Sequence, residues 1–343
     1  MIKSELNVAI FGAGSVGCYI GGQLAGAGAL VQFVGRERFK QALDQNGLNL
    51  THYLRAPIII PRDKFQFNLN LDTASPIDIV LVTVKSQDTE EAGTLLAKSL
   101  SKDTLIISFQ NGVGNADRLR KVMAGFKVLT GMVPFNVTSK KAGYFHCGTE
   151  GDLILERDDT NLSRQLAACF DKVGQACLVS DDIKAVQWGK LLVNLNNGMN
   201  TLSGVPLKTG LVQRDYRKAM ALMIEEALSV VQKVGIVPAK FGKSSAQSMI
   251  KILRLPNFLY QPIMDRVLKI DETARSSMLD DLELGRTSEI DYLQGEIVRL
   301  AASSGQKAPI NQIILERVHE AFREGVSPMM TGSEILAVIR NAQ

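Results

Sequence analysis

The stretch Asn7–Gly17 reads NVAIFGAGSVG and decides the fold of the first half of the chain. Asn7–Phe11 is a short run of β-branched, aliphatic and aromatic residues, which predicts a buried strand. A GxGxxG follows, and Ser15–Ala27 continues as a helix of small residues. In this strand–turn–helix context the glycines allow a tight turn and a close approach of the backbone to a pyrophosphate. The predicted dinucleotide loop comprises Gly12, Ala13, Gly14, Ser15, Val16 and Gly17.

Further strands and helices alternate after this loop. Strands are predicted at Leu30–Val34, Asp78–Lys85 and Thr104–Phe109, and irregular β structure at Leu48–Phe67. Near-continuous apolar strands separated by helices are typical of a parallel sheet covered on both faces. Antiparallel additions, joined by a Lys140-Lys141 turn, are expected at Met132–Val137, Ala142–Cys147 and Asp152–Glu156. The first half is therefore predicted to be an α/β Rossmann domain with a parallel sheet.

The second half is predicted to be all-α. Ser180–Asp182 provides a cap for a helix over Ile183–Asn197. Other helices, ended by glycines or followed by them, are expected at Gln213–Val234, Tyr260–Glu283, Ser288–Ser304 and Asn311–Glu324. At 343 residues the chain is long for a single core, so two domains are expected, a cofactor-binding domain at 1–180 and a helical substrate and dimerisation domain at 181–343.

Composition excludes several classes of function. The chain has 39 basic and 35 acidic side chains, a net charge of +4, and no basic run beside aromatic residues, so no nucleic-acid partner is expected. No apolar run approaches the roughly 20 residues of a membrane span, and the short, polar Met1–Leu6 predicts no signal peptide. The 4 cysteines and 3 histidines show no metal-ligand spacing. We expect a cytoplasmic protein with no metal and no membrane partner.

The end of the second predicted strand bears on cofactor choice. An NAD enzyme usually places an acidic residue there to bind the ribose 2′-hydroxyl. Here the first charged residue is Arg36, whose guanidinium matches a 2′-phosphate in charge and geometry. Arg36 favours NADPH, while Glu37 next to it keeps NADH open.

The remaining sequence has one polar helix face and two single polar residues that are candidates for a site. On the helix from Ile183, one side carries Gln187, Lys190, Asn194 and Asn197, and the other carries Trp188, Leu191, Leu192 and Leu195. The polar side suits either an ordinary solvated face or a binding surface. Ser288 is a candidate N-cap that places Glu289 in a first helical turn, where the helix dipole favours its charged form. Asn111 follows a buried strand, as an Asx-turn or as a cofactor contact.

Four stretches, together with the glycine loop, resemble the ketopantoate reductase family. They are VK at Val84-Lys85, QNGVG at Gln110–Gly114, WGKLLVN at Trp188–Asn194 and SSMLDDLELGRTSEIDYLQG at Ser276–Gly295. They span nearly the whole chain in the family's order. The resemblance implies NADPH-dependent reduction of a 2-oxo acid to a 2-hydroxy acid, in a cleft between the two domains. In the family the product is pantoate, a precursor of pantothenate.

The resemblance also implies roles for individual residues. Lys190 corresponds to the catalytic lysine and general acid, and Glu289 to the carboxylate that binds the substrate hydroxyl. Substrate and cofactor would be held by Asn111, Asn194 and Ser277, with Lys85 close to both. The partners implied are a small 2-oxo acid and a second copy of the chain, as a homodimer formed through helical surfaces.

The chain departs from the family pattern at two positions. Where the family commonly has a second asparagine on the lysine helix, this chain has Gly198; we expect Asn197, freed by a flexible Gly198, to supply the substrate contact. Asp88 stands where a glutamine often follows the lysine of the VK stretch, and Gln87 precedes it. Both changes weaken ketopantoate as the substrate more than they weaken a 2-oxo acid. Two alternatives stay open: a D-2-hydroxyacid dehydrogenase on the same scaffold with a hydrophobic 2-oxo acid as substrate, and a nicotinamide-nucleotide sensor.

Overall fold

The computed structural model of the protein describes residues 5–158, 160–242, 244–267 and 274–342. The chain forms two compact units, Met1–Ile183 and Lys184–Gln343, whereas the sequence placed the boundary between residues 180 and 181. The first unit is α/β with a mostly parallel sheet, and the second is helical. The predicted fold class is confirmed.

The first unit is built on an eight-stranded sheet in the order β12-β11-β8-β7-β6-β1-β2-β5. Its strands are β1 (Asn7–Phe11), β2 (Leu30–Val34), β5 (Gln66–Asn68), β6 (Ile79–Val82), β7 (Leu105–Ser108), β8 (Lys127–Met132), β11 (Leu153–Glu156) and β12 (Cys177–Ser180). All neighbours are parallel except β8 and β11. Because β2 and β6 flank β1 on opposite sides, the carboxyl end of β1 is the topological switch point where such sheets bind ligands.

A second sheet has the order β4-β3-β10-β9, from β3 (Leu48–His52), β4 (Ile58–Ile60), β9 (Val137–Lys141) and β10 (Tyr144–Cys147). The antiparallel pairing of β9 and β10 was expected, but the predicted Lys140-Lys141 turn is wrong, because both positions belong to β9. The turn falls at Ala142-Gly143, where the φ of Gly143 is +76° and a Cβ would lie 2.6 Å from the Cβ of Asn46. The strand predicted at Met132–Val137 is also wrong, since β8 ends at Met132 and β9 begins at Val137.

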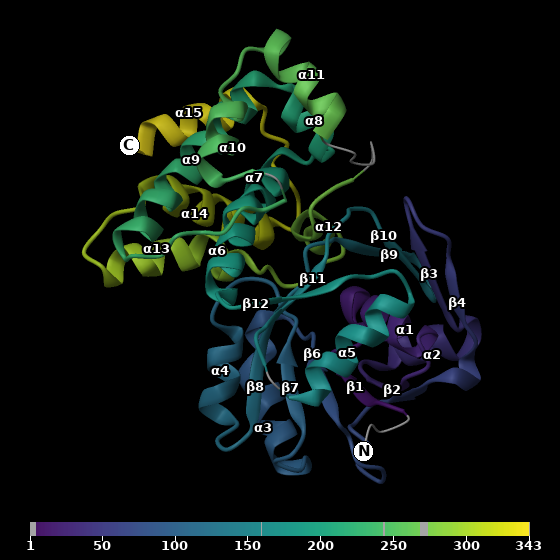
Figure 1. The fold of residues 1–343 in the computed structure, drawn as a ribbon. Coiled ribbons are helices and arrows are strands. Elements are labelled where there is room, and N and C mark those ends of the chain that lie inside the picture. The colour runs from purple at the N-terminus through teal and green to yellow at the C-terminus, as the bar shows by residue number, and fades with distance from the viewer. Residues whose placement is uncertain (1–4, 159, 243, 268–273, 343) are drawn as a thin grey trace. The chain divides into compact units, whose positions relative to one another are not determined.

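Helices cover both faces of the large sheet. They are α1 (Ser15–Gly26), α2 (Glu37–Asn46), α3 (Thr89–Ser99), α4 (Asn115–Val122) and α5 (Asn161–Lys172), with single 3-10 turns at Arg62–Lys64 and Ser86–Asp88. α1 contacts β1 and β2 as well as all four strands of the second sheet, so it lies between the two sheets (Figure 1). On the opposite face α3 and α4 close a second apolar core, to which Val80, Ile106 and Leu119 belong.

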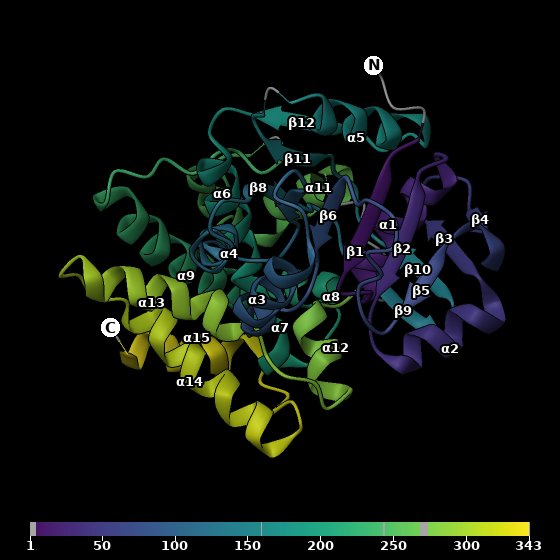
Figure 2. The same ribbon diagram turned by 90° about the horizontal axis from the view of Figure 1, so that it is seen from below.

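The second unit consists of helices around α9 (Arg214–Lys233). The others are α6 (Ile183–Asn194), α7 (Asn196–Ser203), α8 (Leu207–Val212), α10 (Ala246–Leu253), α11 (Asn257–Val267), α12 (Ser277–Glu283), α13 (Gln294–Ser303), α14 (Pro309–Glu324) and α15 (Gly332–Ala342), with a 3-10 turn, η3, at Ile290–Tyr292. α9 packs against α10, α13, α14 and α15, the last three of which lie side by side in Figure 2. No helix in the described part of the chain is both long enough and apolar enough to cross a bilayer.

Three predicted helix extents in this unit are wrong. The helix from Ile183 ends at Asn194, and a second helix starts at Asn196, with only Leu195 between them. The single helix predicted over Tyr260–Glu283 is two helices; residues 268–273 lie outside the described residues, and Ser276 caps α12 by accepting a hydrogen bond from Leu279 N. The helix predicted over Ser288–Ser304 is η3 followed by α13.

Candidate functional site

Two glycines of the loop after β1 stand at positions where a larger residue would not fit. Gly12 has a φ of +111°, and a Cβ on it would lie 2.5 Å from Val84 N. A Cβ on Gly17 would lie 2.5 Å from Gly12 O, so the first turn of α1 packs directly on the loop backbone. At Gly14, in contrast, the nearest atom to a Cβ would be Gly12 O at 4.0 Å, and no side chain in the described structure caps α1 there. The loop therefore presents open backbone at a helix N-terminus, which fits a nucleotide phosphate.

Charged side chains follow β2 at the start of α2. Arg36 is exposed and occupies the N-cap position of α2. Glu37 accepts a hydrogen bond from Gln41 Nε2 at 3.2 Å, one turn along the same helix. The guanidinium of Arg38 lies over the ring of Phe39, 5.0 Å from its centroid. Glu37 and Arg38 thus contact their own helix.

A buried polar network joins the loops that follow β6 and β7. Gln110 Nε2 donates to Val84 O at 3.1 Å and to Thr89 Oγ1 at 2.7 Å. Asn115 Nδ2 donates to Asn111 O at 2.7 Å and to Ser86 Oγ at 3.1 Å. These bonds hold the backbone next to Lys85 and that of Asn111 together at the carboxyl edge of the sheet. Lys85 and Asn111 themselves are half-buried.

Sequence reasoning missed this network. Thr89 and Asn115 are buried at 0% and 1% exposure, and they start α3 and α4. The signal available was a polar residue at the first position of a helix behind a buried strand. Many helices begin with a polar residue, so the sequence does not show that these two side chains join the loops by hydrogen bonds.

Lys190 lies on α6 together with Asn194, one helical turn further on. The side chains on the apolar side of α6 and at the break after it are buried: Trp188, Leu191, Leu192 and Leu195. On the polar side Lys190 is only 8% exposed, and Gln187, Asn194 and Asn197 are half-buried. This burial argues against an ordinary solvated face, because charged residues are seldom buried without a partner.

The environment of Lys190 acts on its charge in two ways. Burial lowers the pKa of Lys190 from its usual 10.5 to about 8, because the ammonium loses its hydration. The nearby carboxylate of Glu289 opposes this and raises the pKa. A lysine in this state keeps most of its charge near neutral pH but can release its proton readily, which suits a general acid.

Glu289 is half-buried and precedes η3. The expectation that it lies in the first turn of a helix capped by Ser288 is wrong, since Glu289 is itself the N-cap residue of a single 3-10 turn. Ser288 Oγ does accept a hydrogen bond from Ile290 N at 3.1 Å. A single 3-10 turn sums few peptide dipoles, so the neighbouring ammonium of Lys190 is the better partner for this carboxylate.

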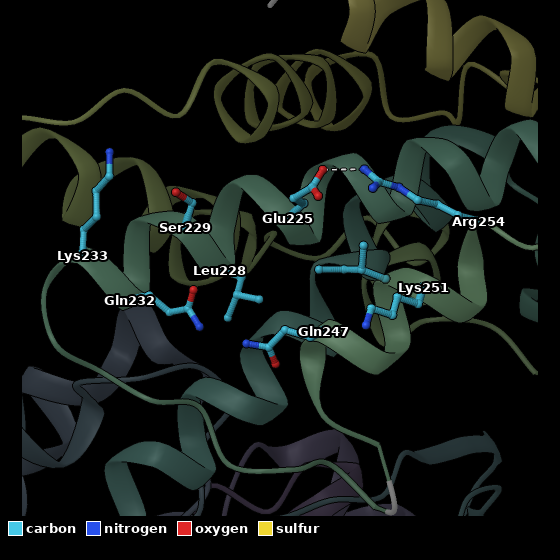
Figure 3. A pocket seen from close by; sticks show the side chains of 9 residues that line it. Glu225, Leu228, Ser229, Gln232, Lys233, Gln247, Lys251 and Arg254 are labelled. Atoms are coloured by element: carbon cyan, nitrogen blue, oxygen red, sulfur yellow. Dashed lines mark hydrogen bonds and ion pairs between the residues drawn. The ribbon is translucent and has the colours of Figure 1, made fainter.

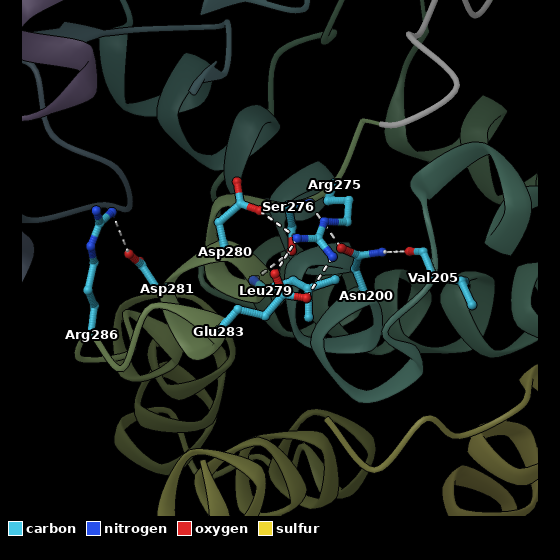
Figure 4. Close-up of polar contacts among 9 residues, drawn as sticks. All are labelled: Asn200, Val205, Arg275, Ser276, Leu279, Asp280, Asp281, Glu283 and Arg286. Atoms are coloured by element: carbon cyan, nitrogen blue, oxygen red, sulfur yellow. Dashed lines mark hydrogen bonds and ion pairs between the residues drawn. The ribbon is translucent and has the colours of Figure 1, made fainter. Parts of the chain in front are cut away.

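Ser277 is the first residue of α12 and is half-buried. Its position is fixed by Asn200, which is fully buried in α7. Asn200 Oδ1 accepts a hydrogen bond from Ser276 N at 2.9 Å, and its Nδ2 donates to Val205 O at 2.7 Å (Figure 4). Nothing in the sequence indicates this role of Asn200, because Ser276 lies 76 residues away.

The expectation that Gly198 is flexible is wrong. Gly198 is buried within α7, and a Cβ there would lie 2.9 Å from Gln294 Nε2 and 3.0 Å from Ile314 Cγ2. Asn197 belongs to α7, beyond the break at Leu195, and it is half-buried. The interruption between α6 and α7 therefore lies before Asn197 and not at the glycine.

A separate open groove of about 510 Å³ lies between α9 and α10 (Figure 3). Its lining residues are Glu225, Leu228, Ser229, Gln232, Lys233, Gln247, Ile250, Lys251 and Arg254. Glu225 and Arg254 form an ion pair of 2.5 Å across it. None of the predicted site residues lines this groove. Across the described residues, no cluster of three or more His, Cys, Asp or Glu side chains could hold a metal ion.

Comparison with known families gives two matches that together cover most of the chain. Residues 8–159 match the model of the family described as ketopantoate reductase PanE/ApbA. Residues 182–322 match the model of its C-terminal domain.

Relatives and solved structures agree with these matches. The chain is 25% identical over 315 residues to 2-dehydropantoate 2-reductase from Pyrococcus horikoshii, covering 90% of this chain and 95% of the relative. A PanE/ApbA family ketopantoate reductase from Ralstonia eutropha JMP134 superposes with a TM-score of 0.78 at 28% identity, covering 93% and 99% of the two chains. D-mandelate dehydrogenase with NADH and anilino(oxo)acetate also has a TM-score of 0.78, with the same coverage. At 21% identity this last likeness shows the fold alone.

Proposed function

Because the chain belongs to the ketopantoate reductase family of oxidoreductases, we propose that it uses NADPH to reduce ketopantoate to pantoate. The observation that carries the proposal is the burial of Lys190 beside Glu289, on a helix that also presents Asn194. The reaction adds a hydride to the keto carbon and a proton to its oxygen, and releases NADP⁺. A sensor of nucleotide state has no need of such a lysine–carboxylate pair.

Lys190 is the proposed proton donor. Its ammonium stabilises the negative charge that develops on the keto oxygen and then transfers a proton to it. Glu289 helps to keep Lys190 protonated and accepts a hydrogen bond from the substrate hydroxyl. Asn111, Asn194, Asn197 and Ser277 are the proposed hydrogen-bonding partners of the substrate carboxylate and hydroxyl. The half-buried positions of these side chains support this, because each is partly withdrawn from bulk water.

The first unit is the proposed cofactor domain. NADPH, when bound, supplies the hydride. The backbone from Gly12 to Gly17 would hold its pyrophosphate, and Lys85 and Asn111 would lie near its nicotinamide end. Arg36 is the proposed partner of the 2′-phosphate, supported by its exposure directly after β2 and by the engagement of Glu37 with Gln41. The expected preference is therefore for NADPH over NADH.

A second candidate is a D-2-hydroxyacid dehydrogenase that acts on another branched 2-oxo acid. Gly198 favours it, because this position offers no side-chain amide to a substrate hydroxyl and is filled by its neighbours. Ketopantoate carries a hydroxyl on its side chain, in addition to the keto acid group. A substrate without that hydroxyl leaves no hydrogen bond unmade at such a site.

The two candidates are separated by substrate preference. Purified protein with NADPH is assayed with ketopantoate, with 2-oxoisovalerate, which lacks the hydroxymethyl group, and with benzoylformate. The proposal predicts the highest kcat/KM for ketopantoate. A higher value for either of the other acids favours the second candidate, and no NADPH oxidation with any of them contradicts both. Light scattering of the same preparation tests the homodimer, for which a mass of two chains is expected.

A further inference from the structure

We propose that Gln294 is a positioning residue that holds the segment carrying Glu289 against the helix carrying Lys190 and Asn194. Gln294 occupies the space left by Gly198 and binds the chain at the break between α6 and α7. The inference rests on the proposed function, because it explains the hydrogen bond from Gln294 to Leu195 by the proposed roles of Glu289, Lys190 and Asn194.

The contacts of Gln294 place it at the helix break. Gln294 is fully buried at the start of α13, and its Nε2 donates to Leu195 O at 2.6 Å. Leu195 is the residue between α6 and α7. The carboxamide therefore binds the chain at the one residue where α6 has ended and α7 has not yet begun.

Gly198 makes this contact possible. A Cβ at this position would come within 2.9 Å of Gln294 Nε2 and 3.1 Å of Ile290 Cδ1. Either neighbour would have to move, and the Nε2 position is already fixed by Leu195. The glycine and the long amide side chain thus fit each other, and an amide from α13 stands where α7 has no side chain.

One short stretch of chain carries both Glu289 and Gln294. Glu289 immediately precedes η3, and Gln294 follows it with only Leu293 between them. Ile290, within η3, is fully buried next to the Gly198 backbone. A contact that fixes Gln294 to Leu195 therefore also restricts where Glu289 lies relative to α6. Small displacements of catalytic groups reduce rates strongly, so such a restriction matters for turnover.

A cost in hydrogen bonding supports a role beyond stability. Gln294 Oε1 is buried and has no hydrogen-bond partner within the described residues. A buried acceptor without a partner opposes folding, and a methionine of similar length would avoid it. Residues that break a local rule of stability are expected where function requires them.

The test compares Gln294→Met with Gln306→Met. Gln306 is the control in the same unit, because its Nε2 donates to Val230 O on α9 at 3.3 Å and to Ser304 Oγ at 2.8 Å. Gln294→Met should lower kcat for ketopantoate by about 10- to 100-fold, the scale of a displaced catalytic group. KM for NADPH should match that of Gln306→Met, and the midpoint of thermal unfolding should not fall below that of the wild type, because methionine removes the buried unpaired Oε1. Equal kcat in the two variants, or a kcat loss explained by a lower unfolding midpoint, overturns the inference.

A second pair of variants tests the fit to Gly198. Gly198→Ala should lower kcat in the wild-type background by displacing the carboxamide. In a Gln294→Ala background the added loss should be smaller than in the wild type, because the clash with Nε2 is removed while the close approach to Ile314 and Ile290 remains. Independent, additive losses contradict the inference. Lys190→Ala separates it from the proposed function: a variant with unimpaired turnover removes the proposed mechanism, whereas an inactive Lys190→Ala beside a fully active Gln294→Met removes only the role of Gln294.

Discussion

Two opposing influences set the charge of Lys190. Its burial disfavours the ammonium, and the carboxylate of Glu289 favours it, with a resulting pKa of about 8. Of the two, the carboxylate comes from a residue of the same helical unit as Lys190. The pair also explains why a carboxylate is needed beside a proton donor. Without it, burial alone would leave more of the lysine neutral at physiological pH.

The lysine pKa leads to a prediction about pH. A general acid works in its protonated form, so kcat for reduction should be level below pH 8 and fall above about pH 8. Glu289→Gln removes the influence that raises the pKa, so the decline should start at lower pH in this variant. The measurement is kcat against pH for both proteins at saturating substrates. A decline at the same pH in both would show that Glu289 does not act on the titrating group.

Arg36 is expected to contribute to the binding of NADPH and not to that of NADH. Arg36→Ala should weaken NADPH by about one to two decades in affinity, since a charge-assisted contact to the 2′-phosphate is lost. NADH has no 2′-phosphate and should bind as before. Arg38→Ala is the matched control, because Arg38 lies over Phe39 and is expected to affect both cofactors little. Titration of each cofactor by fluorescence measures the effect, and equal weakening of the two would make Arg36 structural.

Among the elements, those defined by local pattern could be predicted. β1 and β2 have the predicted bounds, because each is a short apolar run with a turn or glycine after it. α6 begins at Ile183, directly after the polar Ser180–Asp182. The interruption between α6 and α7 could not be predicted, because the side chain that binds Leu195 O there comes from a glutamine 99 residues away. The same holds for the start of α12, where Asn200 binds Ser276 from a distant helix.

Asn197 belongs to α7 and not to the helix that carries Lys190. If it still reaches the substrate, Asn197→Ala should raise KM for ketopantoate and leave NADPH binding unchanged. Asn196→Ala is the contrast: Asn196 Oδ1 accepts a hydrogen bond from Tyr216 at 2.9 Å, so this change should lower the unfolding midpoint instead. Steady-state kinetics and thermal unfolding of both variants separate these effects. Unchanged kinetics in Asn197→Ala would mean that the pocket lacks this contact and would favour a less hydroxylated acid.

At the scale of the whole molecule, the two units divide the proposed work. The first presents the glycine loop, Arg36, Lys85 and Asn111 at the carboxyl edge of one sheet, and the second presents Lys190 and Glu289. The sequence was sufficient for the fold of each unit, because a strand, a glycine turn and a helix are adjacent in the chain. The candidate site residues could be named, but not the amides that hold them, since Asn115, Asn200 and Gln294 act across elements.

Turnover of Lys190→Ala with ketopantoate and NADPH, both saturating, is measured beside that of the wild type. The cofactor loop lies in the other unit, so the affinity for NADPH, measured by titration, should be unchanged. With Lys190 as the proton donor, kcat should fall by about 100-fold or more. A variant that binds NADPH normally and reduces ketopantoate at a rate near that of the wild type would contradict the account.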